Sequence, residues 1–253
     1  MTGMVWTARR VSSGMWAVAK KDMRLYYVKG PVVIFGLLFP LFLFVAFSLG
    51  RNLTGDMFAA PMLVMAVFFS SSSVGPIIAP WETRMRTLEK LMTAPIPVAS
   101  IILGGVLAGF AFGIAISSIA LISAVVLLGV TISQPALLAV SMVVACFGFS
   151  SFGIFLSYPP TDNPSNVMML ANLVKLPLIF VSGVFIPLSD MSRLGGTLAF
   201  LSPLTYFSEL ARSSLGFSPV ASDLINILAL SGFAVVFLVL AIVMHGRNMW
   251  KRF

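Results

Sequence analysis

The sequence has few charged residues. Asp, Glu, Lys and Arg together make up 9% of its 253 residues, whereas soluble domains carry about 25%. Hydrophobic residues make up 59%, and the mean hydropathy is +1.04. This composition excludes an ordinary soluble domain and predicts a protein of the lipid bilayer. The net charge is +8, but the basic residues do not gather in one patch, so we expect no nucleic-acid partner.

Cysteine and histidine occur once each. A single cysteine excludes an intrachain disulfide and a CxxC metal or redox site. Cys146 lies inside an apolar run, and we expect it to be a small packing residue. The lone histidine, His245, does not build a zinc site. We expect it at the membrane interface, where the last apolar run meets a basic tail.

Motifs for enzyme chemistry are missing as well. The sequence has no GxxxxGK[ST] phosphate loop, no HExxH motif and no nucleophile elbow. The apolar segments contain no pair of carboxylates, which weighs against a proton-driven transporter and an intramembrane aspartyl protease. We therefore predict a protein that is not an enzyme and binds no cofactor directly. Any energy that it uses has to come from a partner.

Six apolar segments each approach or exceed the ~20 residues that a helix needs to cross a bilayer. They predict an all-α polytopic membrane protein with six transmembrane helices, whose residues 1–253 form a single transmembrane domain. The third segment is longer than usual, so it must tilt, project from the bilayer or break near Gly104-Gly105. The segments are 31–50, 57–80, 99–129, 135–158, 165–187 and 223–245.

The distribution of Lys and Arg predicts the orientation in the membrane. With the N-terminus in the cytoplasm, twelve basic residues fall on that side and three on the outer side, while Lys175 lies within a span. We therefore predict a multi-pass protein of the cytoplasmic (inner) membrane with both termini in the cytoplasm. The twelve are Arg9, Arg10, Lys20, Lys21, Arg24, Lys29, Arg84, Arg86, Lys90, Arg247, Lys251 and Arg252; the three are Arg51, Arg193 and Arg212.

Residues 13–29 predict an amphipathic helix that lies in the membrane interface. Trp16, Val18 and Tyr26 belong to a broad apolar face, and Lys20 and Arg24 belong to the opposite one. The alternative is a basic tail that only sets the orientation.

The segment 81–97 is the one dense charge cluster between two long apolar runs. Wound as a helix, it places Glu82 and Arg86 on a charged side, in the order that favours an ion pair. Pro95 and Pro97 then end the helix. We interpret the segment as a binding surface for a soluble partner; the alternative is a solvated loop. Its apolar side consists of Met85, Leu88, Leu91 and Met92, and its charged side also holds Glu89 and Lys90.

The outer segment 188–222 is long and moderately apolar. It predicts two short helices, at about 190–201 and 204–215, separated by Ser202-Pro203. Such helices can re-enter the outer leaflet where protein satisfies their free backbone groups. The alternative is a plain surface loop.

The fifth span carries a partly polar face. Lys175 is the one cation placed near the middle of the bilayer, where its burial is costly. Asn172 and Ser182 lie on the same helical face, and Ser71 belongs to a serine run in the second span. One interpretation is a wall of a transport path, with Lys175 meeting an anionic part of the cargo. The alternative is a seam between helices, stabilised by hydrogen bonds, in which Lys175 snorkels.

Two stretches of the chain resemble the ABC-2 type transporter permeases, the membrane subunits of a class of ABC exporters. With six spans and an interfacial helix, the likeness covers nearly the whole chain. The first stretch is Glu82…Thr87-Leu88-Glu89…Leu91…Pro95 followed by Ile101-Ile102-Leu103-Gly104. The second is Leu176-Pro177…Phe180-Val181-Ser182-Gly183-Val184-Phe185…Pro187, then Ser202-Pro203-Leu204-Thr205-Tyr206 and Glu209…Arg212. The chain departs from the pattern at Gly105, where many members have Lys or Arg.

The resemblance implies an ATP-driven exporter. Two permease copies would pair, as a homodimer, and each would engage a separate ATP-binding cassette subunit that holds ATP and Mg. Helix 82–92 would act as a coupling helix. The first, second and fifth spans would line the path, with Asn172, Lys175, Ser182 and Ser71 as candidate path residues. The coupling surface would include Glu82, Arg84, Arg86, Thr87, Leu88, Glu89, Lys20 and Arg24, and the outer gate Pro187, Pro203, Tyr206, Glu209 and Arg212.

The cargo expected from this resemblance is amphipathic: a drug-like molecule, a lipid or a lipid-linked glycan. The compact chain favours the drug-exporter branch, and hence multidrug efflux. A second hypothesis, from another class, is a membrane scaffold or assembly factor that transports nothing and recruits a soluble partner through the helix at 81–97.

Overall fold

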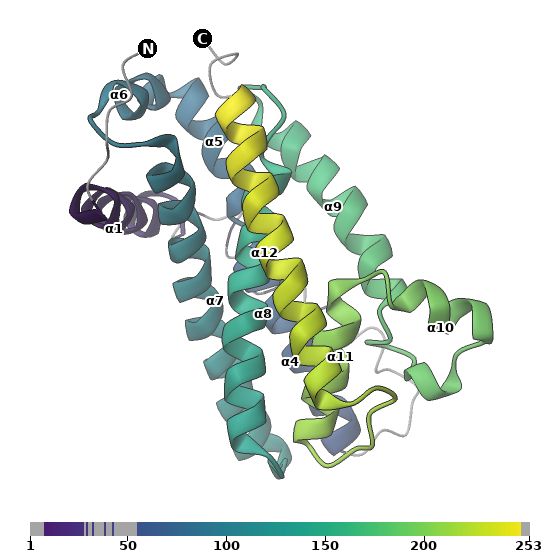
Figure 1. The fold of residues 1–253 in the computed structure, drawn as a ribbon. Helices are drawn as coiled ribbons and strands as arrows, with labels where there is room; N and C mark the ends of the chain where they lie inside the picture. Colours follow the sequence, from purple (N-terminus) through teal and green to yellow (C-terminus); the bar gives the residue numbers. More distant parts are fainter. Residues whose placement is uncertain are drawn as a thin grey trace.

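The computed structural model of the protein describes residues 8–27, 29, 32, 38, 42 and 55–248. Within them the regular elements are helices, and no strand is present (Figure 1). The predicted first span, 31–50, falls almost entirely outside the described residues, as does Arg51. The helices are α1 (Ala8–Leu25), α4 (Gly55–Ser72), α5 (Gly75–Arg84), α6 (Thr87–Thr93), α7 (Val98–Leu128), α8 (Pro135–Leu156), α9 (Pro164–Val181), η2 (Leu188–Asp190), α10 (Arg193–Ala199), α11 (Pro203–Ser214) and α12 (Asp223–Asn248).

Five helical segments in the described residues are long and apolar enough to cross a membrane. They correspond to the second through sixth predicted spans, because α4 and α5 together form the first of the five. The segments are Ala59–Arg84, Val98–Val126, Pro135–Leu156, Pro164–Val181 and Asp223–Asn248.

The long helices α7, α8 and α12 run alongside each other, and α4 packs against α7 and α8 (Figure 1). At one end of this bundle, α1 crosses α7, and α6 and the end of α12 lie nearby. At the other end, α11 packs against α4, α8 and α12, and α10 contacts α9. The segment 81–97 and the segment 188–222 therefore lie at opposite ends of the molecule.

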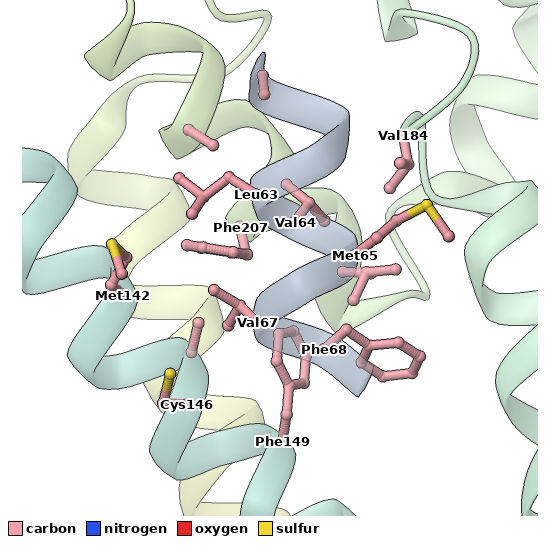
Figure 2. Packing of buried hydrophobic residues seen from close by; sticks show 14 of the residues in the cluster. Leu63, Val64, Met65, Val67, Phe68, Met142, Cys146, Phe149, Val184 and Phe207 are labelled. Atoms are coloured by element: carbon pink, nitrogen blue, oxygen red, sulfur yellow. The ribbon is translucent and has the colours of Figure 1, made fainter. Parts of the chain in front are cut away.

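The main core surrounds α4. Phe68 meets the ring of Phe149 edge to face, with ring centroids 5.0 Å apart, and Phe149 in turn contacts Phe207 of α11 (Figure 2). Cys146 is fully buried in the same cluster, as predicted for a packing residue. These contacts hold α4, α8 and α11 together.

The second span breaks between Ser72 and Gly75, where it meets α8. A Cβ atom on Gly75 would lie 2.6 Å from the carbonyl carbon of Gly153, and a Cβ on Gly153 would lie 2.7 Å from the carbonyl oxygen of Ser72. Only glycine at both positions allows the two backbones to approach so closely. The break is therefore held in place by a neighbouring helix.

The third span does not break at Gly104-Gly105, because α7 is one helix from Val98 to Leu128. Gly104 instead lies at the point where α1 crosses α7. A Cβ atom there would lie 2.6 Å from Cβ of Val18 and 2.8 Å from the carbonyl oxygen of Met15. The absence of a side chain allows α1 to dock on α7.

Candidate functional site

The segment 81–97 is two helices and not one. α5 ends at Arg84, and α6 begins at Thr87. Arg86, between them, has a φ of 53°, and it is the one residue other than glycine with positive φ among the described residues. This left-handed residue turns the chain. The prediction of one continuous amphipathic helix is therefore wrong, and Met85 is exposed while Glu82 and Leu88 are buried.

Glu82 is the centre of a buried polar cluster that joins α1, α5 and α6, which we call the polar junction. Its carboxylate accepts hydrogen bonds from Lys21 Nζ, Tyr26 Oη and Thr87 Oγ1. The residue is only 2% exposed. The predicted ion pair with Arg86 is not formed in the described structure, since Glu82 pairs with Lys21. α1, which is distant in sequence, thus meets the consecutive helices α5 and α6 at one carboxylate.

Asp22 is a second buried carboxylate in the polar junction. Its Oδ1 lies 3.0 Å from Nζ of Lys21. Burial raises the pKa of Asp22 to about 6, and the positive charge of Lys21 opposes this shift. The residue borders a small cavity of about 30 Å³, which is large enough for a water molecule. The spacing of residues 13–29 gives no sign that Asp22 is buried.

Gly105 and His245 line the same cavity. Nε2 of His245 lies 2.9 Å from Oγ of Ser157, and Nδ1 lies 2.9 Å from the carbonyl oxygen of Ala241. The side chain is buried, and it ties the end of α12 to the end of α8. Its predicted position at the membrane interface stays a prediction.

Two aromatic rings extend the polar junction toward α5. Tyr26 and Trp81 stack with ring centroids 5.5 Å apart, and Nζ of Lys29 lies 4.2 Å from the centre of the Trp81 ring. A cation over an aromatic face is a favourable contact. Sequence reasoning missed this pairing, because nothing in the spacing of Tyr26 and Trp81 shows that they meet.

The predicted coupling residues fall into two groups. Glu82 and Leu88 are buried, and Thr87 is half-buried and bonded to Glu82. The other members are exposed at this end of the bundle. They are Arg84, Arg86, Glu89, Lys20 and Arg24, and Lys90 is exposed with them.

Lys175, the cation of the fifth span, is buried and reaches the break in the second span. Its Nζ donates a hydrogen bond of 2.8 Å to the carbonyl oxygen of Ser72, the last residue of α4. In a continuous helix this oxygen would accept from the residue four positions on, but that residue is Pro76, which has no N–H. Lys175 supplies the missing donor, and a cation is favourable at the C-terminus of a helix.

The other three candidate path residues do not gather around Lys175. Asn172 is half-buried and lines a groove between α5 and α9. Ser182 donates to the carbonyl oxygen of Ile179 at the end of its own helix. Ser71 lies against α7 at Gly113, where an added Cβ atom would meet its Oγ.

The predicted outer-gate residues lie in the 187–220 region, at the end opposite the polar junction. Pro187 precedes η2, and Pro203 begins α11 behind the N-cap Ser202. Tyr206 Oη donates to the carbonyl oxygen of Phe200 at 2.8 Å. The two short helices predicted around Ser202-Pro203 are present as α10 and α11.

Glu209 and Arg212 belong to the same outer region, on α11. Glu209 Oε2 accepts from the backbone N–H of Val220 at 2.6 Å, and its side chain is buried. Burial raises the pKa of Glu209, although the hydrogen bond from Val220 and the charge of Arg212 oppose the shift. Glu209 therefore fastens α11 to the loop that leads into α12.

The chain is similar to a known protein family. The sequence model of the ABC-2 type transporter family matches residues 13–216, which include most of α1, the polar junction and the outer helices α10 and α11. No curated protein matches the chain.

Proposed function

The chain belongs to the ABC-2 type transporter family and is the permease component of an ABC transporter, and from this premise we propose that it exports an amphipathic compound. The energy comes from ATP, hydrolysed with Mg by a separate cassette subunit. Two permease copies form the path between them. Within the ABC-2 type transporter family, we propose that the protein belongs to the drug-exporter branch.

The observation that carries this proposal is the exposed charged surface beside the polar junction. Arg84, Arg86, Glu89 and Lys90 are exposed at one end of the bundle, while Glu82 holds the same segment to α1 from inside. Charged, solvent-facing side chains on a short helix suit a contact that forms and changes with the nucleotide state of a soluble partner.

A displacement of α6 has a direct route into the bundle. Thr87 of α6 is hydrogen-bonded to Glu82, and Glu82 is hydrogen-bonded to Lys21 of α1. α1 in turn crosses α7 at Gly104. Close-packed contacts such as this crossing transmit displacement because they have little free volume. We propose that closure of the cassette subunits moves α1 and α6 together and opens the path at the outer end, where α10 and α11 form the gate.

The experiment compares two charge reversals in complexes of the permease with its cassette subunit. Glu89→Lys alters the proposed contact surface. Asp162→Lys is the matched control, since Asp162 is also an exposed carboxylate and lies in the loop between α8 and α9. We expect Glu89→Lys to lower permease-stimulated ATP hydrolysis and export in vesicles by roughly tenfold, the effect of about 1.4 kcal/mol of lost interaction. Asp162→Lys retains both. Full coupling in the Glu89→Lys complex would contradict the proposed contact surface.

A further inference from the structure

A groove of about 850 Å³ lies between α5 and α9. Its apolar wall comes from Ile77, Met168, Met169, Leu173 and Leu176. Met169 and Leu173 are 71% and 69% exposed, so the apolar surface continues from the groove onto the open face of α9. A groove of this size and lining suits a hydrocarbon chain or a drug-sized apolar body.

One end of the groove is positively charged. Arg84, the last residue of α5, lines it, and no ion pair involves Arg84 in the part of the chain that the structure describes. Among the described residues that line the groove, none is a carboxylate. Lys29 lies against Trp81, another lining residue, and adds a second cation near the same end. The N-terminus of α9, at Pro164 and Ser165, also lies there, and the dipole of a helix favours anions at that position.

The apolar wall extends from this charged end for about half the thickness of a membrane. Ser165 and Leu176 are separated by eleven steps along α9, which at 1.5 Å per residue is about 16 Å. The hydrocarbon core of a bilayer is about 30 Å thick. The groove thus matches one leaflet in length, with its cations at the end where α6 lies.

We propose that this groove binds an amphipathic molecule with an anionic headgroup. The headgroup lies at Arg84, and the hydrocarbon part lies along Met168, Leu173 and Leu176. Asn172, which also lines the groove, provides a polar contact along its length. This inference rests on the proposed function and names the chemical class of its cargo. Cationic amphiphiles are disfavoured because they would place like charges together, and neutral ones gain no ionic contact.

The experiment uses Trp81 as a reporter, because its ring lines the groove. The sequence has four tryptophans, and Trp6, Trp16 and Trp250 are replaced by Phe. The full-length permease, without any cassette subunit, is placed in nanodiscs of zwitterionic lipid. Three spin-labelled probes share one hydrocarbon chain and carry a carboxylate, a neutral amide or a quaternary ammonium headgroup. We expect saturable quenching of Trp81 by the carboxylate probe at concentrations roughly tenfold below those of the other two, as a charge-assisted contact implies.

Two further variants make the test specific. Arg84→Gln is expected to remove most of the preference for the carboxylate probe. Arg86→Gln, an exposed arginine that does not line the groove, is expected to leave the preference unchanged. Quenching that rises linearly and equally for all three probes would reflect ordinary partition into the bilayer and would overturn the inference, as would an undiminished preference in Arg84→Gln.

The outcomes for this site and for the proposed function are separable. A carboxylate preference that depends on Arg84, in a protein that shows no ATP-driven export, supports the site and contradicts the exporter. ATP-driven export without any carboxylate preference supports the exporter and contradicts the site.

Discussion

Charged side chains in this protein compensate for interrupted helices. Lys175 bonds the carbonyl oxygen of Ser72, which Pro76 deprives of its helical donor. Glu82 bonds Thr87, the first residue of α6, and so places a carboxylate at a helix N-terminus, where the dipole favours it. The sequence marks Lys175 and Glu82 as unusual. Ser72 lies 103 positions from Lys175, so only the tertiary fold brings this pair together. Thr87 lies five positions after Glu82, so this second contact is local.

The raised pKa of Asp22 leads to a prediction about pH. The pKa is about 6 in the fold against an ordinary 3.8, so the native state binds the proton more tightly than the unfolded chain does. The contribution of Asp22 to the free energy of unfolding is complete below about pH 4 and is lost as the pH rises through 6. A shift of about two pKa units corresponds to about 3 kcal/mol of this free energy. Because proton binding and folding are linked in this way, we expect the thermal midpoint of the purified permease to fall by roughly a few degrees between pH 5 and pH 7.

Asp22→Asn is the control for this prediction. Its thermal midpoint is expected to change much less over the same pH range. Glu82 and His245, which line the same cavity, are still present in this variant, so the difference reports on Asp22 alone. The same pH dependence in Asp22→Asn and in the unaltered chain would assign the effect to another group.

At the scale of the elements, helix ends follow from local sequence and helix crossings do not. α9 stops at Val181, short of the predicted 187, because Gly183 adopts a φ of 75° just after the helix. α1 begins at Ala8, before the predicted residue 13. The turn at Arg86 has no such signal, because arginine rarely adopts positive φ. The docking of α1 on α7 depends on Gly104, whose role is visible only when Val18 is seen against it.

Gly104→Ala is predicted to separate α1 from α7. The new Cβ atom would meet the backbone of Met15 and Cβ of Val18 at distances below 3 Å. Overpacking of this kind costs about 1–3 kcal/mol. We expect a lower thermal midpoint and faster proteolysis of the N-terminal segment.

The matched control is Gly232→Ala, in the interior of α12, where an added Cβ atom meets nothing within 4 Å. It is expected to be neutral or to stabilise the protein by up to about 1 kcal/mol, since Ala favours a helix over Gly. Equal effects of the two substitutions would show that the crossing at Gly104 is not tight.

At the scale of the whole molecule, the fold separates the two segments for which a function is proposed. The polar junction and α6 lie at one end of the bundle, and α10 and α11 lie at the other (Figure 1). The basic residues predict that the first end faces the cytoplasm. The groove beside Arg84 opens at that same end, so one side of the protein carries both the proposed cargo site and the proposed cassette contact.

Cysteine labelling tests this orientation. Cys146 is fully buried, so the unaltered chain provides a background with little reactivity. Arg193→Cys and Arg86→Cys each place one thiol at an exposed position. We expect an impermeant maleimide to label Arg193→Cys in intact cells and Arg86→Cys only after the membrane is opened. The reverse pattern would invert the topology.

The sequence by itself determined that this chain is helical, belongs in a membrane and belongs to the ABC-2 type transporter family. Hydrophobic runs and helix-ending residues act over short distances and can be read locally. Tertiary structure alone decided that Glu82 is buried and binds Lys21 and Tyr26, that Lys175 completes the end of α4, and that a charged groove lies between α5 and α9. Each of these features requires contact between two segments that are far apart in the chain. Neither segment by itself determines which of its side chains are buried or paired.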